Sequence, residues 1–108
     1  MESQNYKMLH LTLKRKWFQM ILSGEKTEEY REIKPYWLKR FKYYCNHDDM
    51  AHELDYEFTH IHFKNGYSKN APSFIIELKE IKFGQAKPEW SDNWQGEVFI
   101  IKLGNIIK

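Results

Sequence analysis

Three charged side chains of the segment 24–31 (GEKTEEYR) could together bind a polar ligand: Lys26, Glu29 and Arg31, in the spacing G-x-K-x-x-E-x-R. An arginine offers a planar fork of donors to a phosphate or to a base edge. A lysine supplies a compact cation or, when its pKa is lowered, a base or nucleophile. The glutamate could orient both cations or accept hydrogen bonds from a nucleobase. The same group could instead be a structural ion pair, a common role for such residues.

The sequence places these residues where a helix ends and a strand begins. Apolar residues at helical spacing predict a helix over residues 14–23, and Gly24 is placed to be its left-handed stop. Residues 27–33 are predicted to form a strand, on which Glu29 and Arg31 share one face. Lys26 lies on the turn before it. We therefore expect Glu29 and Arg31 to face a cleft that solvent can reach.

With a preceding strand over residues 9–13 and the helix over residues 14–23, this motif resembles the ASCH family, a branch of the PUA-like β-barrels, over nearly the whole chain. The resemblance implies an α+β fold, namely a small PUA-like β-barrel of five to six strands flanked by two or three helices. It also implies a cleft that binds RNA or a nucleoside and is lined by the charged residues of the motif, Lys26, Glu29 and Arg31.

One branch similar to this family removes the acetyl group from acetylated cytidine, using a motif lysine, a threonine and a glutamate from another strand. Lys26 matches the lysine, and Glu77, on a strand predicted over residues 73–81, is the candidate for that glutamate, which makes these two the candidate catalytic residues. A lone acid in an apolar strand needs a partner, and Lys26 or Arg31 could provide it. The threonine position holds Glu29 here. We therefore expect binding of RNA or a modified nucleoside, with hydrolysis of a modified-base amide or of RNA as the alternative.

Several aromatic residues lie in segments predicted to be irregular. Tyr67 follows the tight-turn signal Asn65-Gly66 and stands on a loop where it could stack on a base or cap the edge of the core. Trp90 and Trp94 lie in the irregular stretch 84–96, where packing against the core or as a lid is the better interpretation.

The histidines raise the question of a metal. His60 and His62 lie two apart on a strand predicted over residues 56–63, so their rings could reach one ion. We interpret them, with His10, as half-exposed strand residues. The single cysteine, Cys45, excludes an intrachain disulfide and a cysteine metal cluster, and we expect no cofactor and no metal.

Charge is unevenly distributed along the chain. Residues 1–45 hold 10 lysines and arginines against 5 acidic residues, a net +5, whereas residues 46–108 hold 7 against 10, a net −3, which gives the overall +2. A basic face suits phosphate contact. A basic helix predicted over residues 35–44 could serve this purpose, could be only a solvated surface, or could meet an acidic protein partner.

The remaining pattern predicts one domain, residues 1–108, without repeats or linkers. Further elements are a loop over residues 46–55 and a last core strand over residues 98–103, with Ile106 and Ile107 adding a short pairing. Short strands without regular strand–helix alternation favour a small closed barrel. Apolar runs of four to five residues are too short to span a membrane. With the polar residues 1–7 and the single cysteine, they lead us to expect a cytoplasmic protein.

Overall fold

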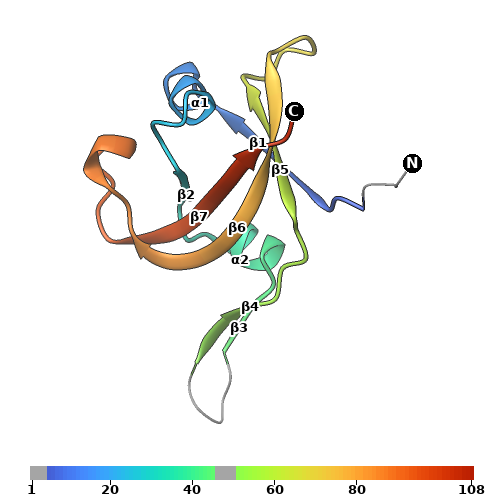
Figure 1. The fold of residues 1–108 in the computed structure, drawn as a ribbon. Helices are drawn as coiled ribbons and strands as arrows, with labels where there is room; N and C mark the ends of the chain where they lie inside the picture. Colours follow the sequence, from blue (N-terminus) through green and yellow to red (C-terminus); the bar gives the residue numbers. More distant parts are fainter. Residues whose placement is uncertain (1–4, 46–50) are drawn as a thin grey trace.

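The computed structural model describes residues 5–45 and 51–108 (Figure 1). Its elements, in chain order, are β1 (Met8–Leu13), α1 (Arg15–Leu22), β2 (Glu28–Arg31), α2 (Pro35–Arg40), β3 (Tyr43–Cys45), β4 (His52–Leu54), β5 (His60–Asn65), β6 (Ser73–Gln85), the 3-10 turn η1 (Pro88–Trp90) and β7 (Glu97–Ile106).

Five strands form one sheet in the order β1-β5-β6-β7-β2, in which β1 and β5 run parallel and the other pairs are antiparallel. This sheet curls into a half-barrel (Figure 1). The long strand β6 makes the bend possible, since its pairing with β7 is irregular between Ile76 and Leu78 and again before Glu80. Such bulges bend a strand and increase its twist.

The core fills the concave side of the sheet, and alternation along β1 sends every second side chain of that strand there. Leu9, Leu11 and Leu13 of β1 are buried, whereas His10 between them is exposed. Helix α1 covers one end of the half-barrel and α2 lies near the other (Figure 1). The inner face of α1 contributes three buried residues, Trp17, Phe18 and Ile21. The hairpin of β3 and β4 extends away from the sheet (Figure 1).

The α+β class and the barrel-like curl agree with the sequence prediction, but the sheet is a half-barrel and not a closed barrel. Within the part of the chain that the structure describes, β1 and β2 are the two edges and no ladder joins them. Helix α1 connects these edge strands along the chain. The open seam is bridged instead by the Arg31 side chain of β2, whose Nη2 donates to the Thr12 carbonyl of β1.

The helix predicted over residues 35–44 ends earlier, at Arg40. Lys42 adopts a left-handed conformation with φ of 53°, which turns the chain out of the helix. Tyr43 then pairs with Leu54 in a two-stranded sheet, so part of the loop predicted over residues 46–55 is strand β4. Residues 46–50 of that prediction lie outside the described residues. A ring contact and a 2.6 Å hydrogen bond between Tyr43 and His52 help to hold the hairpin, an interaction that helical periodicity cannot reveal.

The predicted strands are correct in position but differ in length. Strand β5 begins at His60 and not at residue 56, because the preceding segment bonds to the chain ahead of β1 through two 2.9 Å hydrogen bonds between Lys7 and Thr59. Strand β6 runs four residues beyond Ile81, to Gln85. The pairing expected at the end of the chain exists, since Ile106 lies opposite Ile76.

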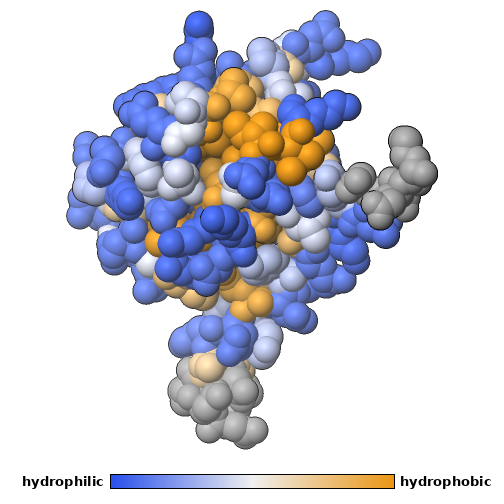
Figure 2. All heavy atoms as spheres, in the orientation of Figure 1, coloured by the Kyte–Doolittle hydropathy of each residue, from blue (hydrophilic) through white to orange (hydrophobic). Residues whose placement is uncertain are grey.

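Apolar side chains gather in the upper part of the face seen in Figure 2, toward α1 and the end of the chain. Leu22 of α1, Ile106 of β7 and the adjacent Ile107 are each more than a third exposed. None of the helices in residues 5–45 and 51–108 combines the length and the apolar character needed to cross a bilayer.

Gly24 provides a test of the junction between α1 and β2. Its φ is +88° and a Cβ there would meet no atom within 4 Å, so Gly24→Ala introduces backbone strain without a clash. We expect the free energy of unfolding to fall by about 1 kcal/mol in urea denaturation. Gly24→Asn should lose less, because asparagine tolerates this conformation better. An alanine variant as stable as the wild type would contradict the left-handed stop.

Candidate functional site

The end of α1 buries Lys26. After the glycine turn, the Lys26 amide donates to the carbonyl of Met20 at 2.9 Å, which folds the chain back under the helix. The Lys26 side chain is only 1% exposed. Its Nζ lies 5.2 Å from the ring centroid of Trp17 and 5.2 Å from that of Tyr30, within the range at which aromatic faces stabilise a cation.

Glu29 neutralises this buried cation and a second one. Lys26 Nζ donates to Glu29 Oε1 at 2.6 Å, and Arg31 Nη2 lies 3.0 Å from Glu29 Oε2. The Glu29 side chain is 8% exposed. The two cations and one carboxylate form what we call the ionic triad, and it carries one net positive charge. Removing one member of a buried ion pair typically costs about 3–5 kcal/mol, because the other charge is left uncompensated.

Arg31 links the triad to the opposite edge of the sheet. Its Nη2 also donates to the backbone carbonyl of Thr12 at 3.1 Å, so that this side chain of β2 reaches across the open seam to β1. Its Cζ lies 5.5 Å from the ring centroid of Trp37 on α2. The Nε atom is buried and has no hydrogen-bond partner among the described residues. The Arg31 side chain is 21% exposed, so part of the guanidinium remains reachable.

The exposed side of the triad forms the wall of a cavity of about 520 Å³. Small-molecule sites typically enclose about 300–1,000 Å³. Glu29 and Arg31 both line it, as their shared strand face predicts. Five aromatic side chains line it too: Trp17, Tyr30, Tyr67, Trp90 and Trp94. Lys14 and Asp92 form an ion pair of 3.3 Å at its rim.

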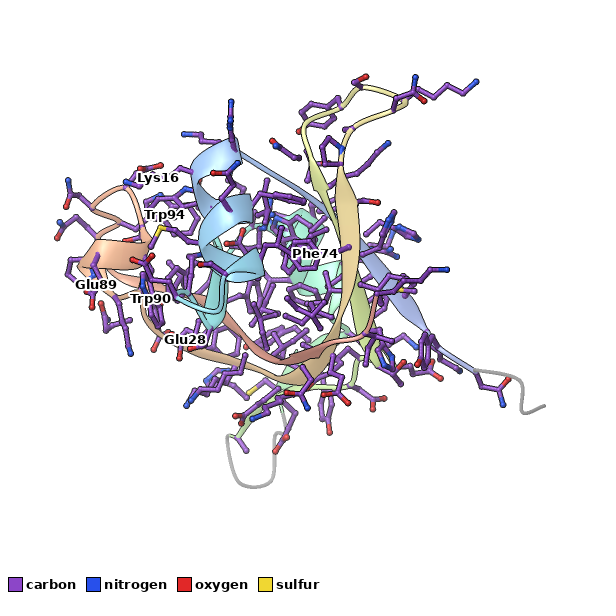
Figure 3. The ribbon with its side chains drawn as sticks, turned by 45° about the horizontal axis from the view of Figure 1, so that its top comes forward. Lys16, Glu28, Phe74, Glu89, Trp90 and Trp94 are labelled. Atoms are coloured by element: carbon purple, nitrogen blue, oxygen red, sulfur yellow. The ribbon has the colours of Figure 1, made fainter. Side chains whose placement is uncertain are left out.

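The two tryptophans after β6 build the outer wall of this cavity. Figure 3 shows Trp90 and Trp94 on the loop between β6 and β7, beside α1. Both pack against a small cluster formed by Tyr30, Val98 and Ile100. Packing was the interpretation favoured from sequence, and the same rings also face the cavity.

Tyr30 and Glu28 point to the other side of β2 from Glu29, in keeping with strand alternation. Tyr30 donates from its hydroxyl to Glu28 Oε1 at 2.7 Å and accepts from the Lys87 amide at 3.2 Å. Burial, followed by the bond to Glu28, raises the pKa of the Tyr30 phenol far above its usual value. Tyr30 therefore remains a neutral donor that ties β2 to the loop carrying Trp90.

Burial also lowers the pKa of Lys26, and the nearby Arg31 adds to that effect. Glu29 and Glu28 act in the opposite direction, because a carboxylate favours the ammonium form. Lys26 does not line the cavity, whereas its partner Glu29 does. The geometry makes Lys26 an internal counter-charge that holds Glu29 in place for Arg31.

The structure does not bring Glu77 to this group. Phe74 and Ile76 of β6 point into the core, so Glu77 lies on the outer face, opposite His60 in the neighbouring strand. Its Oε1 accepts from the amide of Asn105 at 2.9 Å. Glu77 therefore pairs with a backbone amide, whereas Lys26 and Arg31, the partners expected from the sequence, both pair with Glu29.

Tyr67 stands at the cavity with its side chain 91% exposed. It follows Gly66, whose φ of +93° makes the tight turn after β5. This exposure excludes the interpretation that Tyr67 caps the core. Sequence reasoning missed the Thr12 carbonyl, which carries no side-chain signal, and it gave Trp17, within the predicted helix of residues 14–23, no role at the site.

Comparison of this chain with protein-family models, with curated proteins and with solved structures gave no match.

The triad makes a prediction about stability. Glu29→Gln keeps the size of the side chain but leaves two cations, one of them buried, without a counter-charge. We expect the free energy of unfolding to fall by about 3 kcal/mol, the lower end of the range for a broken buried pair, because the amide oxygen still accepts a hydrogen bond. Urea denaturation measures this loss. The matched control, Glu25→Gln at an exposed position of the same turn, should change it by less than about 0.5 kcal/mol. Equal stability of both variants would show that the triad is not the anchor described here.

Proposed function

We propose that this protein is an ASCH-type domain of PUA-like architecture that binds RNA or a nucleoside in the cavity beside Arg31. One observation carries the proposal: the charged motif residues Glu29 and Arg31 line a cavity of about 520 Å³ together with five aromatic side chains. A nucleobase is a flat aromatic group with a polar edge, and it is attached to a sugar that often bears an anionic phosphate. The cavity offers a complementary partner for each of these parts.

Arg31 binds the polar part of the ligand. Glu29 and the Thr12 carbonyl already hold one terminal nitrogen, and this fixes the plane of the guanidinium. The net positive charge of the triad favours an anion or the carbonyl edge of a base. Because the plane is fixed before binding, little side-chain entropy is lost when the ligand is bound.

The exposed aromatic residues stack on the flat part of the ligand. Tyr67 presents almost all of its ring to solvent at the cavity. Base stacking on an aromatic side chain is worth about 1–3 kcal/mol per base. Lys14, Arg15 and Lys16 are exposed at the start of α1, and Lys14 lines the cavity, so phosphates flanking a bound nucleotide have cations within reach.

Substitution of Tyr67 tests the site without endangering the fold. A thermal-shift screen of nucleosides and short RNAs first identifies a ligand, since binding stabilises the folded state by mass action. Tyr67→Ala should then lower the affinity for that ligand by about 5- to 150-fold, the equivalent of one stacking contact. Tyr44→Ala, at a tyrosine that is 49% exposed on the hairpin strand β3, is the matched control and should leave affinity unchanged. Equal effects of both variants, or no stabilising nucleoside or RNA, would contradict the proposal.

Binding of RNA should also weaken steeply with salt. With about three to five phosphate contacts, the slope of log K against log salt concentration should be roughly −2 to −4 on single strands. Lys39→Ala, on the exposed face of α2, should flatten the slope by less than about one unit and leave ligand choice unchanged. Arg31→Ala should weaken the binding of every ligand. An affinity indifferent to salt would contradict phosphate contact.

Hydrolysis of an amide on a modified base is the second candidate, and one observation favours it: burial lowers the pKa of Lys26 toward the neutral form that a base or nucleophile requires. The 2.6 Å bond to Glu29 opposes it by favouring the ammonium. Binding is therefore the first proposal.

Turnover of acetylated cytidine decides between the two candidates. If binding is the function, neither the wild type nor Lys26→Arg releases acetate between pH 6 and about 9, the range in which a lysine of lowered pKa would act. The reverse result would be a rate that rises with pH near neutrality in the wild type and is lost in Lys26→Arg. That result would make Lys26 the catalytic group.

A further inference from the structure

A pair of histidines lies on the outer face of the sheet and does not line the cavity. His10 of β1 and His62 of β5 are direct partners in the parallel ladder. Their Nδ1 atoms are 3.2 Å apart, and their rings meet edge to face with centroids 5.3 Å apart. The backbone fixes this arrangement, because Leu9, Leu11, Ile61 and Phe63 are buried on the inner face and both histidines must point outward.

We propose that His10 and His62 form a binding site for a divalent late transition-metal ion, such as Zn²⁺, coordinated by both Nδ1 atoms. Zn²⁺ binds imidazole nitrogens at about 2.0–2.1 Å, so two such nitrogens at a tetrahedral angle lie roughly 3.3 Å apart. The 3.2 Å spacing of the two Nδ1 atoms matches this distance. Imidazole is a ligand suited to Zn²⁺, Cu²⁺ and Ni²⁺, whereas Mg²⁺ and Ca²⁺ prefer oxygen.

A metal ligand must be a neutral imidazole. Burial, followed by the charges of His10 and Lys64, lowers the pKa of His62, which favours that form of this ring. Lys64, two residues along the same face of β5, also repels a cation and limits the affinity.

The site has two protein ligands and open positions. Within residues 5–45 and 51–108, no cluster of three or more histidine, cysteine or acidic side chains is arranged to hold a metal ion. Water or a group from another molecule would therefore complete the coordination, as at exchangeable metal sites and unlike closed structural ones.

His60 does not belong to this pair, although its sequence spacing from His62 pointed to a shared ion. Its Nδ1 lies 2.8 Å from the hydroxyl of Thr59, and its ring stacks on Tyr6 at 3.6 Å between centroids. The ligand pair combines instead two different strands, and His10 and His62 are 52 positions apart in the sequence.

Calorimetric titration of the full chain with Zn²⁺ tests the proposal. The wild type should bind one equivalent. His10→Gln and His62→Gln should each weaken binding by about ten-fold or more, because one ligand alone does not chelate. The matched control replaces the other three histidines, His47, His52 and His60, with glutamine and should retain the wild-type affinity. Mg²⁺ should bind to none of them.

Nitrogen-15 chemical shifts of the imidazoles give a second readout that does not depend on affinity alone. On addition of Zn²⁺, the Nδ1 signals of His10 and His62 should move together, whereas those of the other histidines stay in place. Two results would overturn the proposal. One is equal Zn²⁺ binding by the wild type and the His10→Gln, His62→Gln double variant. The other is a wild-type spectrum that Zn²⁺ leaves unchanged, which would reduce the pair to a hydrogen bond between rings.

Discussion

The carboxylate of Glu29 is the interaction on which the rest of the molecule depends. It is buried on a strand of only four residues, and each of its oxygens holds a different cation. Through Lys26 it fixes the turn that leaves α1, and through Arg31 it reaches the carbonyl of Thr12 on the far edge of the sheet. Among the described residues no ladder joins β1 to β2, and this chain of charged groups connects the two edges of the half-barrel. The energetic reason is that a buried charge must be paired.

In this arrangement the two cations of the motif have different roles. Lys26 is enclosed by protein and by the rings of Trp17 and Tyr30, so it acts inward as a counter-charge. Arg31 has part of its guanidinium in the cavity wall and acts outward. The two roles need different chemistry: a compact ammonium fits a tight space, and a planar fork can serve a fold contact and a ligand at once. The proposed binding function therefore uses a residue that the fold has already oriented.

Local sequence patterns correctly predicted the features that depend only on residues close together in the chain. Strand alternation placed Glu29 and Arg31 on one face, and the position of Gly24 marked the end of α1. Long-range pairing decided the rest. The outward orientation of Glu77 follows from which side of β6 faces the core, and the contact of His10 with His62 requires the parallel register of β1 and β5. The Thr12 carbonyl has no side-chain signal at all. Strand β3 looked helical because an apolar stripe continues from α2, and only the pairing with β4 resolves it.

The order of the strands in the sheet has a consequence for how the protein is made. Strand β2 pairs only with β7 among the described strands, so that Glu29 lies opposite Ile101 and Arg31 opposite Phe99. During synthesis the motif is made before β7, the last of the described strands, so its burial is complete only after β7 has been made. The hairpin of β6 and β7 is local and fast to form, whereas the joining of β2 is non-local and slow. Until β2 docks on β7, Lys26 and Glu29 remain hydrated and the apolar faces of β1 and α1 remain uncovered. Exposed apolar surface of this kind is what chaperones typically protect in a nascent chain.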